Sequence, residues 1–205
     1  MDKQEYLNQI STSNRPVKKS KASSLFSSKF FLIGAIGVVT LILIIVIGSA
    51  LSGGKTSGKD TLYSLILHIN NTSEVMKEYQ PNLKSSELRS YSASLQSILS
   101  NTSSDLTTFA TEKYNYKEKD VKKSVVEEQT AAKDELESEL FEAKINGILD
   151  RVYAHKMAYE ISLIAADETK ILKSIKNDQL SEAINRSYNS LNNLYDKFND
   201  FSETK

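Results

Sequence analysis

The stretch LRSYSASLQSILSNTSSDLTTF, residues 88–109, decides the fold class of this chain. Its apolar and small side chains recur at steps of three and four residues, and they are Leu88, Tyr91, Leu95, Ile98, Thr102, Leu106 and Phe109. That spacing puts them on one face of an α-helix. We therefore expect a long amphipathic helix that stops near Tyr114-Asn115-Tyr116.

Four further segments show the same helical period. The first runs from Leu62 to Tyr79 and ends at Pro81-Asn82. The next uses Val121, Val125, Ala132, Leu136, Leu140 and Ala143 and breaks at Asn146-Gly147. The last two run from Leu149 to Ile175, with a break at Asn177-Asp178, and from Leu180 to Phe198. Because every connection is short, neighbouring helices should run antiparallel, which predicts an all-α, up-down bundle of four or five helices.

A different pattern precedes these segments. Residues 30–51 read FFLIGAIGVVTLILIIVIGSAL and contain no charge. At about 1.5 Å per residue, a helix of this length spans roughly 33 Å and can cross a bilayer. A cleaved signal peptide is the alternative, with small residues at Gly48-Ser49-Ala50 and a mature chain beginning near Leu51. The long leader and the long apolar stretch favour an uncleaved transmembrane anchor.

The basic residues around this span predict its orientation. Five of them precede it, and they are Arg15, Lys18, Lys19, Lys21 and Lys29. Only Lys55 and Lys59 follow it closely. The excess of positive charge on the first side predicts a cytoplasmic N-terminus in the plasma (inner) membrane, and the same cluster is suited to contact anionic lipid headgroups.

The chain therefore divides into four parts. Residues 1–29 form a basic cytoplasmic tail and residues 30–51 the single transmembrane helix, whose partner is the lipid bilayer. Residues 52–58 are a glycine- and serine-rich flexible linker. Residues 59–203 form an extracytoplasmic helical bundle, which is large enough to bury a core of its own.

Composition narrows the functional classes. The 205-residue chain carries 26 basic and 26 acidic residues, so its formal charge is zero, and we expect no nucleic-acid partner. Cysteine is absent, which excludes disulfides, thiolate metal sites and thiol nucleophiles. The two histidines, His68 and His155, do not suggest a catalytic triad or a metal cluster. We expect no catalytic residues, no metal and no cofactor.

At residues 149–157 the sequence LDRVYAHKM is similar to a Phe-Asp-Arg-x-Tyr-x-x-x-Met signature. That signature belongs to a bacterial envelope family of unknown function with a ferritin-like four-helix bundle. Asp150, Arg151, Tyr153 and Met157 match in spacing, and Gly147 fits the turn into that family's helix. The resemblance touches about residues 74–200 and implies a ferritin-like bundle.

The chain departs from this family where the pattern tends to carry histidines. The corresponding positions are Leu99, Ile161 and Leu194, which are all aliphatic. Ferritin-like di-iron sites also need Glu-x-x-His pairs, and neither histidine has a glutamate three residues before it. The resemblance thus implies a bundle scaffold without polar ligands in its core.

A few polar positions still have interpretable roles. Asp150 lies in the first turn of its helix, where a carboxylate favours the helix dipole. Arg151 and Tyr153 are either a polar clasp between helices or surface residues. Tyr114 and Tyr116 flank a connection and are the expected partner-contacting pair. The acidic residues between Glu127 and Glu142 have no EF-hand spacing and are read as a solvated face.

These observations predict a membrane-anchored extracytoplasmic helical scaffold or interaction module of the cell envelope, without catalysis and with protein partners. Two alternatives stay open. One is a ferritin-like metal or redox protein, which would need carboxylates that converge inside the bundle. The other is a single-pass sensor, which would need a separate cytoplasmic partner because the tail of about 29 residues holds no output domain.

Overall fold

The computed structural model describes residues 58–201. They form five α-helices and two short 3-10 turns. The helices are α3 (Gly58–Tyr79), α4 (Ser86–Tyr114), α5 (Lys123–Ile145), α6 (Leu149–Ser174) and α7 (Asp178–Asn199), and the turns are η2 (Gln80–Asn82) and η3 (Glu118–Asp120). The prediction of an all-α bundle is confirmed, and each expected helical segment is a helix.

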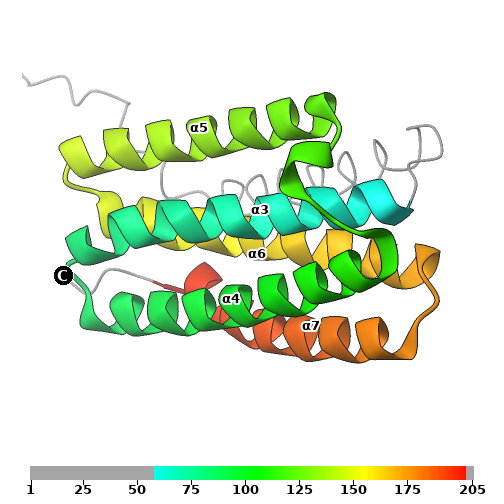
Figure 1. The fold of residues 1–205 in the computed structure, drawn as a ribbon. Coiled ribbons are helices and arrows are strands. Elements are labelled where there is room, and N and C mark those ends of the chain that lie inside the picture. The colour runs from blue at the N-terminus through cyan, green and yellow to red at the C-terminus, as the bar shows by residue number, and fades with distance from the viewer. Residues whose placement is uncertain (1–57, 202–205) are drawn as a thin grey trace, which may run out of the picture. The chain divides into compact units, whose positions relative to one another are not determined.

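Four of the helices form a ring in the order α3, α4, α7 and α6, and α5 packs outside the ring against α3 and α6 (Figure 1). Contacts along the helices give their directions. Asn70 of α3 accepts a hydrogen bond from Ser103 of α4, and Thr102 of α4 donates one to Ser187 of α7. Neighbours around the ring are antiparallel, as the short connections predict.

The connection from α4 to α5 carries the chain across the end of the bundle (Figure 1). It starts at Asn115, whose φ of 53° lies in the left-handed region and ends α4, and the Tyr116 N–H donates to the Ala110 carbonyl at 3.2 Å. Helix α5 consequently lies beside α3 and runs parallel to it. The sequence pattern did not predict this neighbour, because it fixes the direction of successive helices but not which helices touch.

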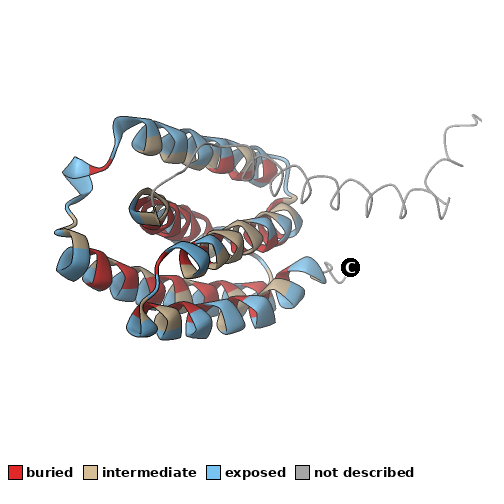
Figure 2. Cartoon of the chain, turned by 90° about the vertical axis from the view of Figure 1, so that its right-hand side faces the viewer, coloured by how far each residue is buried: buried red, intermediate tan, exposed pale blue. Residues whose placement is uncertain are grey.

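The core lies between the four ring helices and is mainly apolar, but it also buries Glu168, Thr102 and Ser187, in contrast to the core without polar ligands that the resemblance implied. Figure 2 shows the buried residues on the inward faces of these helices. Leu99, Ile161 and Leu194, the three aliphatic positions that the sequence comparison singled out, are all buried there. Their aliphatic side chains pack in the core, which is the role that an aliphatic residue has at such a position.

Helix α5 contributes much less to this core and is mostly exposed in Figure 2. Its buried residues are Leu136, Leu140 and Ala143, all in its C-terminal half. The predicted apolar stripe also included Val125 and Ala132, but Val125 is half-buried and Ala132 is exposed. Val125 still packs against the core, whereas the prediction for Ala132 was wrong because this part of α5 meets α3 mainly through polar groups.

Polar contacts hold that half of α5 in place. The Gln129 side chain donates to Ser64 Oγ at 3.1 Å, and Asn71 donates to the Gln129 carbonyl at 3.0 Å. Lys133 forms an ion pair with Glu74 at 2.8 Å. Exposed ion pairs of this kind contribute roughly 0–1 kcal/mol each, so this part of the helix is weakly held.

Two glycines have positions that a side chain would disturb. Gly147, between α5 and α6, has a φ of +73°, and the Ile148 N–H after it donates to the Ala143 carbonyl at 3.0 Å. This is the left-handed C-terminal stop that glycine favours. A Cβ at Gly58 would approach the Ser174 hydroxyl to 2.9 Å, so the start of α3 and the end of α6 meet closely.

The predicted basic tail, the span at residues 30–51 and nearly all of the linker lie outside the described residues. The helices between residues 58 and 201 are each too polar or too short in their apolar runs to span a bilayer. Helix α3 begins at Gly58, the last residue of the predicted linker.

Candidate functional site

Asp150 lies in the first turn of α6, as predicted, and is buried with 4% of its surface exposed. Its carboxylate also reaches the start of α4. It accepts backbone N–H bonds from Lys84 at 2.9 Å and from Ser85 at 2.6 Å. Ser85 is the N-cap of α4, with its hydroxyl accepting from the Leu88 N–H. Asp150 therefore joins the ends of two helices, and its partners identify a structural role.

Arg151 and Tyr153, the two other polar residues of the signature, differ in how far they are buried. Tyr153 is fully buried, and its hydroxyl lies 2.6 Å from Ser92 Oγ of α4. Burial raises the pKa of this phenol above its ordinary value of 10. Arg151 is exposed to solvent. Of the predicted polar clasp, the structure brings Tyr153 and α4 together and leaves Arg151 on the surface.

Tyr114 and Tyr116, the expected partner-contacting pair, are half-buried at one end of the bundle. The Tyr116 ring lies 4.6 Å from the Tyr63 ring, and the Tyr114 ring lies 6.1 Å from the Phe109 ring, measured between centroids. Lys59 lies over the rings of Tyr63 and Tyr114. Much of each ring is thus engaged within the bundle, and contact with a partner stays a prediction.

The histidines have different surroundings. His68 of α3 is buried, and its Nε2 lies 2.6 Å from a carboxylate oxygen of Glu160 on α6, to which Thr72 also donates at 3.5 Å. Glu160 therefore faces His68 rather than His155, and His155 is exposed. Within residues 58–201, no three histidine, aspartate or glutamate side chains gather in an arrangement able to hold a metal ion.

A buried carboxylate lies between α4, α6 and α7. Glu168 of α6 has no exposed surface, and desolvation raises its pKa from 4.5 to about 7. The nearby Ser187 hydroxyl counteracts the rise, although neither carboxylate oxygen has a hydrogen-bond partner of good geometry among the described residues. Ser187 itself accepts from Thr102 at 2.8 Å. The group is consequently poised to bind a proton near neutral pH.

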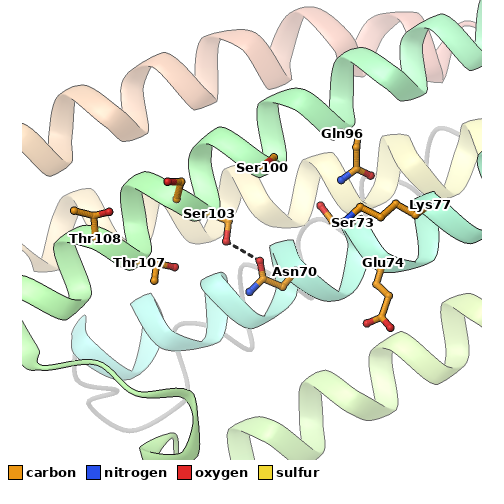
Figure 3. Close-up of a pocket in the computed structure, with 10 residues that line it drawn as sticks. Asn70, Ser73, Glu74, Lys77, Gln96, Ser100, Ser103, Thr107 and Thr108 are labelled. Atoms are coloured by element: carbon orange, nitrogen blue, oxygen red, sulfur yellow. Dashed lines mark hydrogen bonds between the residues drawn. The ribbon is translucent and has the colours of Figure 1, made fainter.

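A groove of about 570 Å³ lies between α3 and α4 (Figure 3). This volume falls within the roughly 300–1,000 Å³ typical of ligand pockets. Hydroxyl side chains make up most of its lining, and they are Ser73, Ser100, Ser103, Ser104, Thr107 and Thr108. No apolar or aromatic residue lines it. The groove is therefore a hydrogen-bonding surface rather than a hydrophobic one.

The remaining lining residues are two amides and a pair of opposite charges. Asn70 and Gln96 face each other's helices across the groove, and Glu74 and Lys77 supply one charge of each sign (Figure 3). Asn70 already accepts from Ser103 at 2.6 Å, and Glu74 is paired with Lys133 of α5. The net charge of the lining is zero.

Two buried oxygens of the groove lack partners. Ser73 has 7% of its surface exposed, and neither its Oγ nor the Oε1 of Gln96 has a hydrogen-bond partner among the described residues. An unpaired buried polar group costs about 1–3 kcal/mol relative to a paired one. These two oxygens can therefore accept hydrogen bonds that no group of the described bundle donates.

The sequence interpretation did not identify this groove, His68 with Glu160, or Glu168. One signal for the groove was present. From Ser90 to Ser104 the chain has no charged residue, although this stretch belongs to a helix with a solvent-facing side. The sequence gives no such signal for Glu168, because its burial depends on how three helices pack.

The chain matches no known protein-family model, no curated protein and no solved structure. The resemblance at residues 149–157 consequently stays a prediction, and what the structure shows is an all-helical bundle of five helices without a family assignment.

Proposed function

We propose that this protein is a membrane-anchored helical module of the cell envelope that holds contacts on the external side and performs no catalysis. The apolar run at residues 30–51 and the basic residues before it support the anchor and the orientation. The bundle that follows is the part that reaches other envelope components. Its contacts with other envelope components are assigned to the groove between α3 and α4.

One observation carries this assignment. The groove contains two buried oxygens without partners, Ser73 Oγ and Gln96 Oε1, on a face that has few charges. Water solvates exposed polar groups well, but a buried unpaired oxygen gains most from a ligand that brings a donor. The groove is thus the described surface with most to gain from being occupied.

The test is photocrosslinking in intact cells. A benzophenone amino acid replaces Ser104, at the groove, in one variant and Ser138, on the exposed face of α5, in a matched variant. We expect crosslinks from position 104 that Ser100→Lys reduces, and few from position 138. Equal crosslinking from both positions, or none from either, would contradict the assignment of the groove.

Orientation and absence of catalysis have tests of their own. Protease added outside intact cells, or outside spheroplasts if an outer barrier exists, should remove material beyond residue 60 and spare the N-terminal tail. Protection of the bundle would reverse the orientation. Stoichiometric iron or manganese in the purified full chain, or redox turnover, would instead support the metal-binding alternative.

A further inference from the structure

The lining of the α3/α4 groove restricts the chemistry of its ligand. Six of the ten lining side chains carry hydroxyls and two carry amides. A hydroxyl both donates and accepts, and it rotates to suit its partner. The best match is therefore a ligand that also presents many groups able to donate and accept at short intervals.

Several ligand classes fit poorly. Lipids and apolar ligands bind best to surfaces lined by apolar and aromatic side chains, whereas every residue that lines this groove is polar or charged. Polyanions and polycations need a surplus of one charge, whereas Glu74 and Lys77 cancel. Peptides usually gain most of their affinity from a few aromatic or arginine anchors in desolvated pockets. The groove has no apolar or acidic pocket of that kind.

We infer that the α3/α4 groove binds a neutral, polyhydroxylated ligand, namely a segment of an uncharged sugar chain. This inference rests on the proposed function and names the class of its ligand. The bundle leaves Ser73 Oγ and Gln96 Oε1 unpaired, and both atoms are buried, so these side chains must turn into the groove before sugar hydroxyls can bond to them. Ser100, Ser104 and Thr108 line the groove along α4, and Figure 3 shows the side chains of Ser100 and Thr108 on that helix.

The expected affinity is weak for a single chain segment. Each hydrogen bond to the ligand replaces one to water, and the lining has no apolar side chain to anchor the ligand, so a dissociation constant of roughly millimolar is expected. Many copies anchored in one membrane facing a repetitive polymer would bind by avidity, which raises apparent affinity without any new contact.

The test uses the full chain in lipid nanodiscs with threonine methyl groups labelled for NMR. Thr107 and Thr108 line the groove, and Thr130 on exposed α5 is an internal reference. The probes are maltohexaose and the N-acetylglucosamine tetramer as neutral sugars, a sulfated dextran as polyanion, and an uncharged serine- and threonine-rich peptide. We expect saturable shifts at Thr107 and Thr108 with at least one neutral sugar, and none at Thr130.

Matched variants separate binding from folding. Ser104→Lys places bulk and charge at an exposed groove position and should weaken sugar binding at least tenfold, whereas Ser104→Thr should keep it. Ser138→Lys makes the same change on α5 and should have no effect. Ser73→Ala removes an unpaired hydroxyl, so it should weaken binding several-fold while leaving the melting temperature unchanged or raised.

The NMR titrations and the variants together support or overturn the inference of a neutral sugar ligand. Shifts with a neutral sugar that Ser104→Lys abolishes support the inference. Shifts with the peptide alone, with the polyanion alone, or with no probe overturn it. Groove-specific crosslinking to a protein would then show that the proposed interaction module stands while its sugar specificity falls.

Discussion

Helices α4 and α5 both turn a face to solvent, but they present opposite chemistry there. Helix α5 carries ten charged residues among its 23. Helix α4 has none between Arg89 and Asp105, and its outward positions in that stretch are mainly serine. Toward the core the contrast is reversed, because α4 buries eight side chains and α5 only three.

The contrast between α4 and α5 suggests different roles for the two helices, one facing solvent and one contacting a ligand. Charged side chains hold water strongly and oppose association, because an ion costs much more to desolvate than a hydroxyl does. Serine and threonine hydroxyls are easier to desolvate when a ligand replaces their water. We therefore assign solvation to α5 and contact to the groove side of α4, and the predictions below compare the two helices.

The largest difference is expected for core positions. Leu99 of α4 is fully buried, whereas Ala132 of α5, which the apolar stripe also placed in the core, is exposed. Leu99→Ala should lower the free energy of unfolding by about 2–5 kcal/mol, because it leaves a cavity. Ala132→Glu should change it by less than about 0.5 kcal/mol. Urea denaturation followed by circular dichroism measures both changes. A large loss of unfolding free energy for Ala132→Glu would show that this position of α5 packs in the core.

A buried and an exposed carboxylate give the next comparison. Glu168 is buried with its pKa raised from 4.5 to about 7, whereas Glu135 of α5 is exposed. The folded state thus holds the Glu168 proton more tightly than the unfolded state does. Its contribution to stability is fully present below about pH 4.5 and is lost as the pH rises through about 7.

Glu168→Gln should remove this dependence. At about pH 8 the variant should be more stable than the wild type by on the order of 3 kcal/mol, since each pKa unit corresponds to about 1.4 kcal/mol. At about pH 4 the two should be nearly equal. Glu135→Gln should leave the pH profile unchanged. Thermal unfolding across this pH range measures the effect, and parallel profiles for wild type and Glu168→Gln would disprove the buried titration.

A smaller effect is expected at the start of α4. Asp150 accepts two backbone N–H bonds from the residues before that helix, and Asp134 of α5 is exposed. Asp150→Asn keeps one acceptor and loses the charge, and should cost about 1–3 kcal/mol. Asp134→Asn should be neutral. An equal response of the two variants in denaturant titrations would mean that the backbone groups find other partners.

The sequence predicted the helices well because period and breaks are local properties. Asn115 and Gly147 adopt the left-handed backbone that ends a helix, and both stand at predicted breaks. The position of α5 was not predictable in this way. Its period is that of an amphipathic helix, yet Ala132 meets solvent because the connection after α4 places α5 beside the polar face of α3.

The polar sites were less predictable for the same reason. Asp150 was expected to favour the dipole of its own helix, but its partners belong to residues 66 positions or so earlier in the chain. Glu160 lies five residues after His155 in the sequence, whereas its partner is His68 on another helix. Pairings between distant residues depend on which helices pack together, and a single sequence does not specify that.

The smallest effect concerns the attachment of α5. The N-terminal half of this helix has no buried side chain and is held by polar contacts such as the Lys133–Glu74 pair. That hydrogen-bonded pair raises the pKa of Lys133 and lowers the pKa of Glu74. Glu74 is largely solvated and Lys133 is half-buried, so Lys133→Gln should change global stability by less than about 1 kcal/mol. Local opening exposes little apolar surface there, so amides of residues 125–133 should exchange faster in this variant, while those of residues 93–104 in α4 should not.

Lys144→Gln, at the other end of α5, is the control for hydrogen exchange. Uniform exchange along α5 and α4 in all three proteins would show that α5 unfolds only with the ring, and the division between a loosely held solvated helix and a firmly packed contact helix would then be wrong.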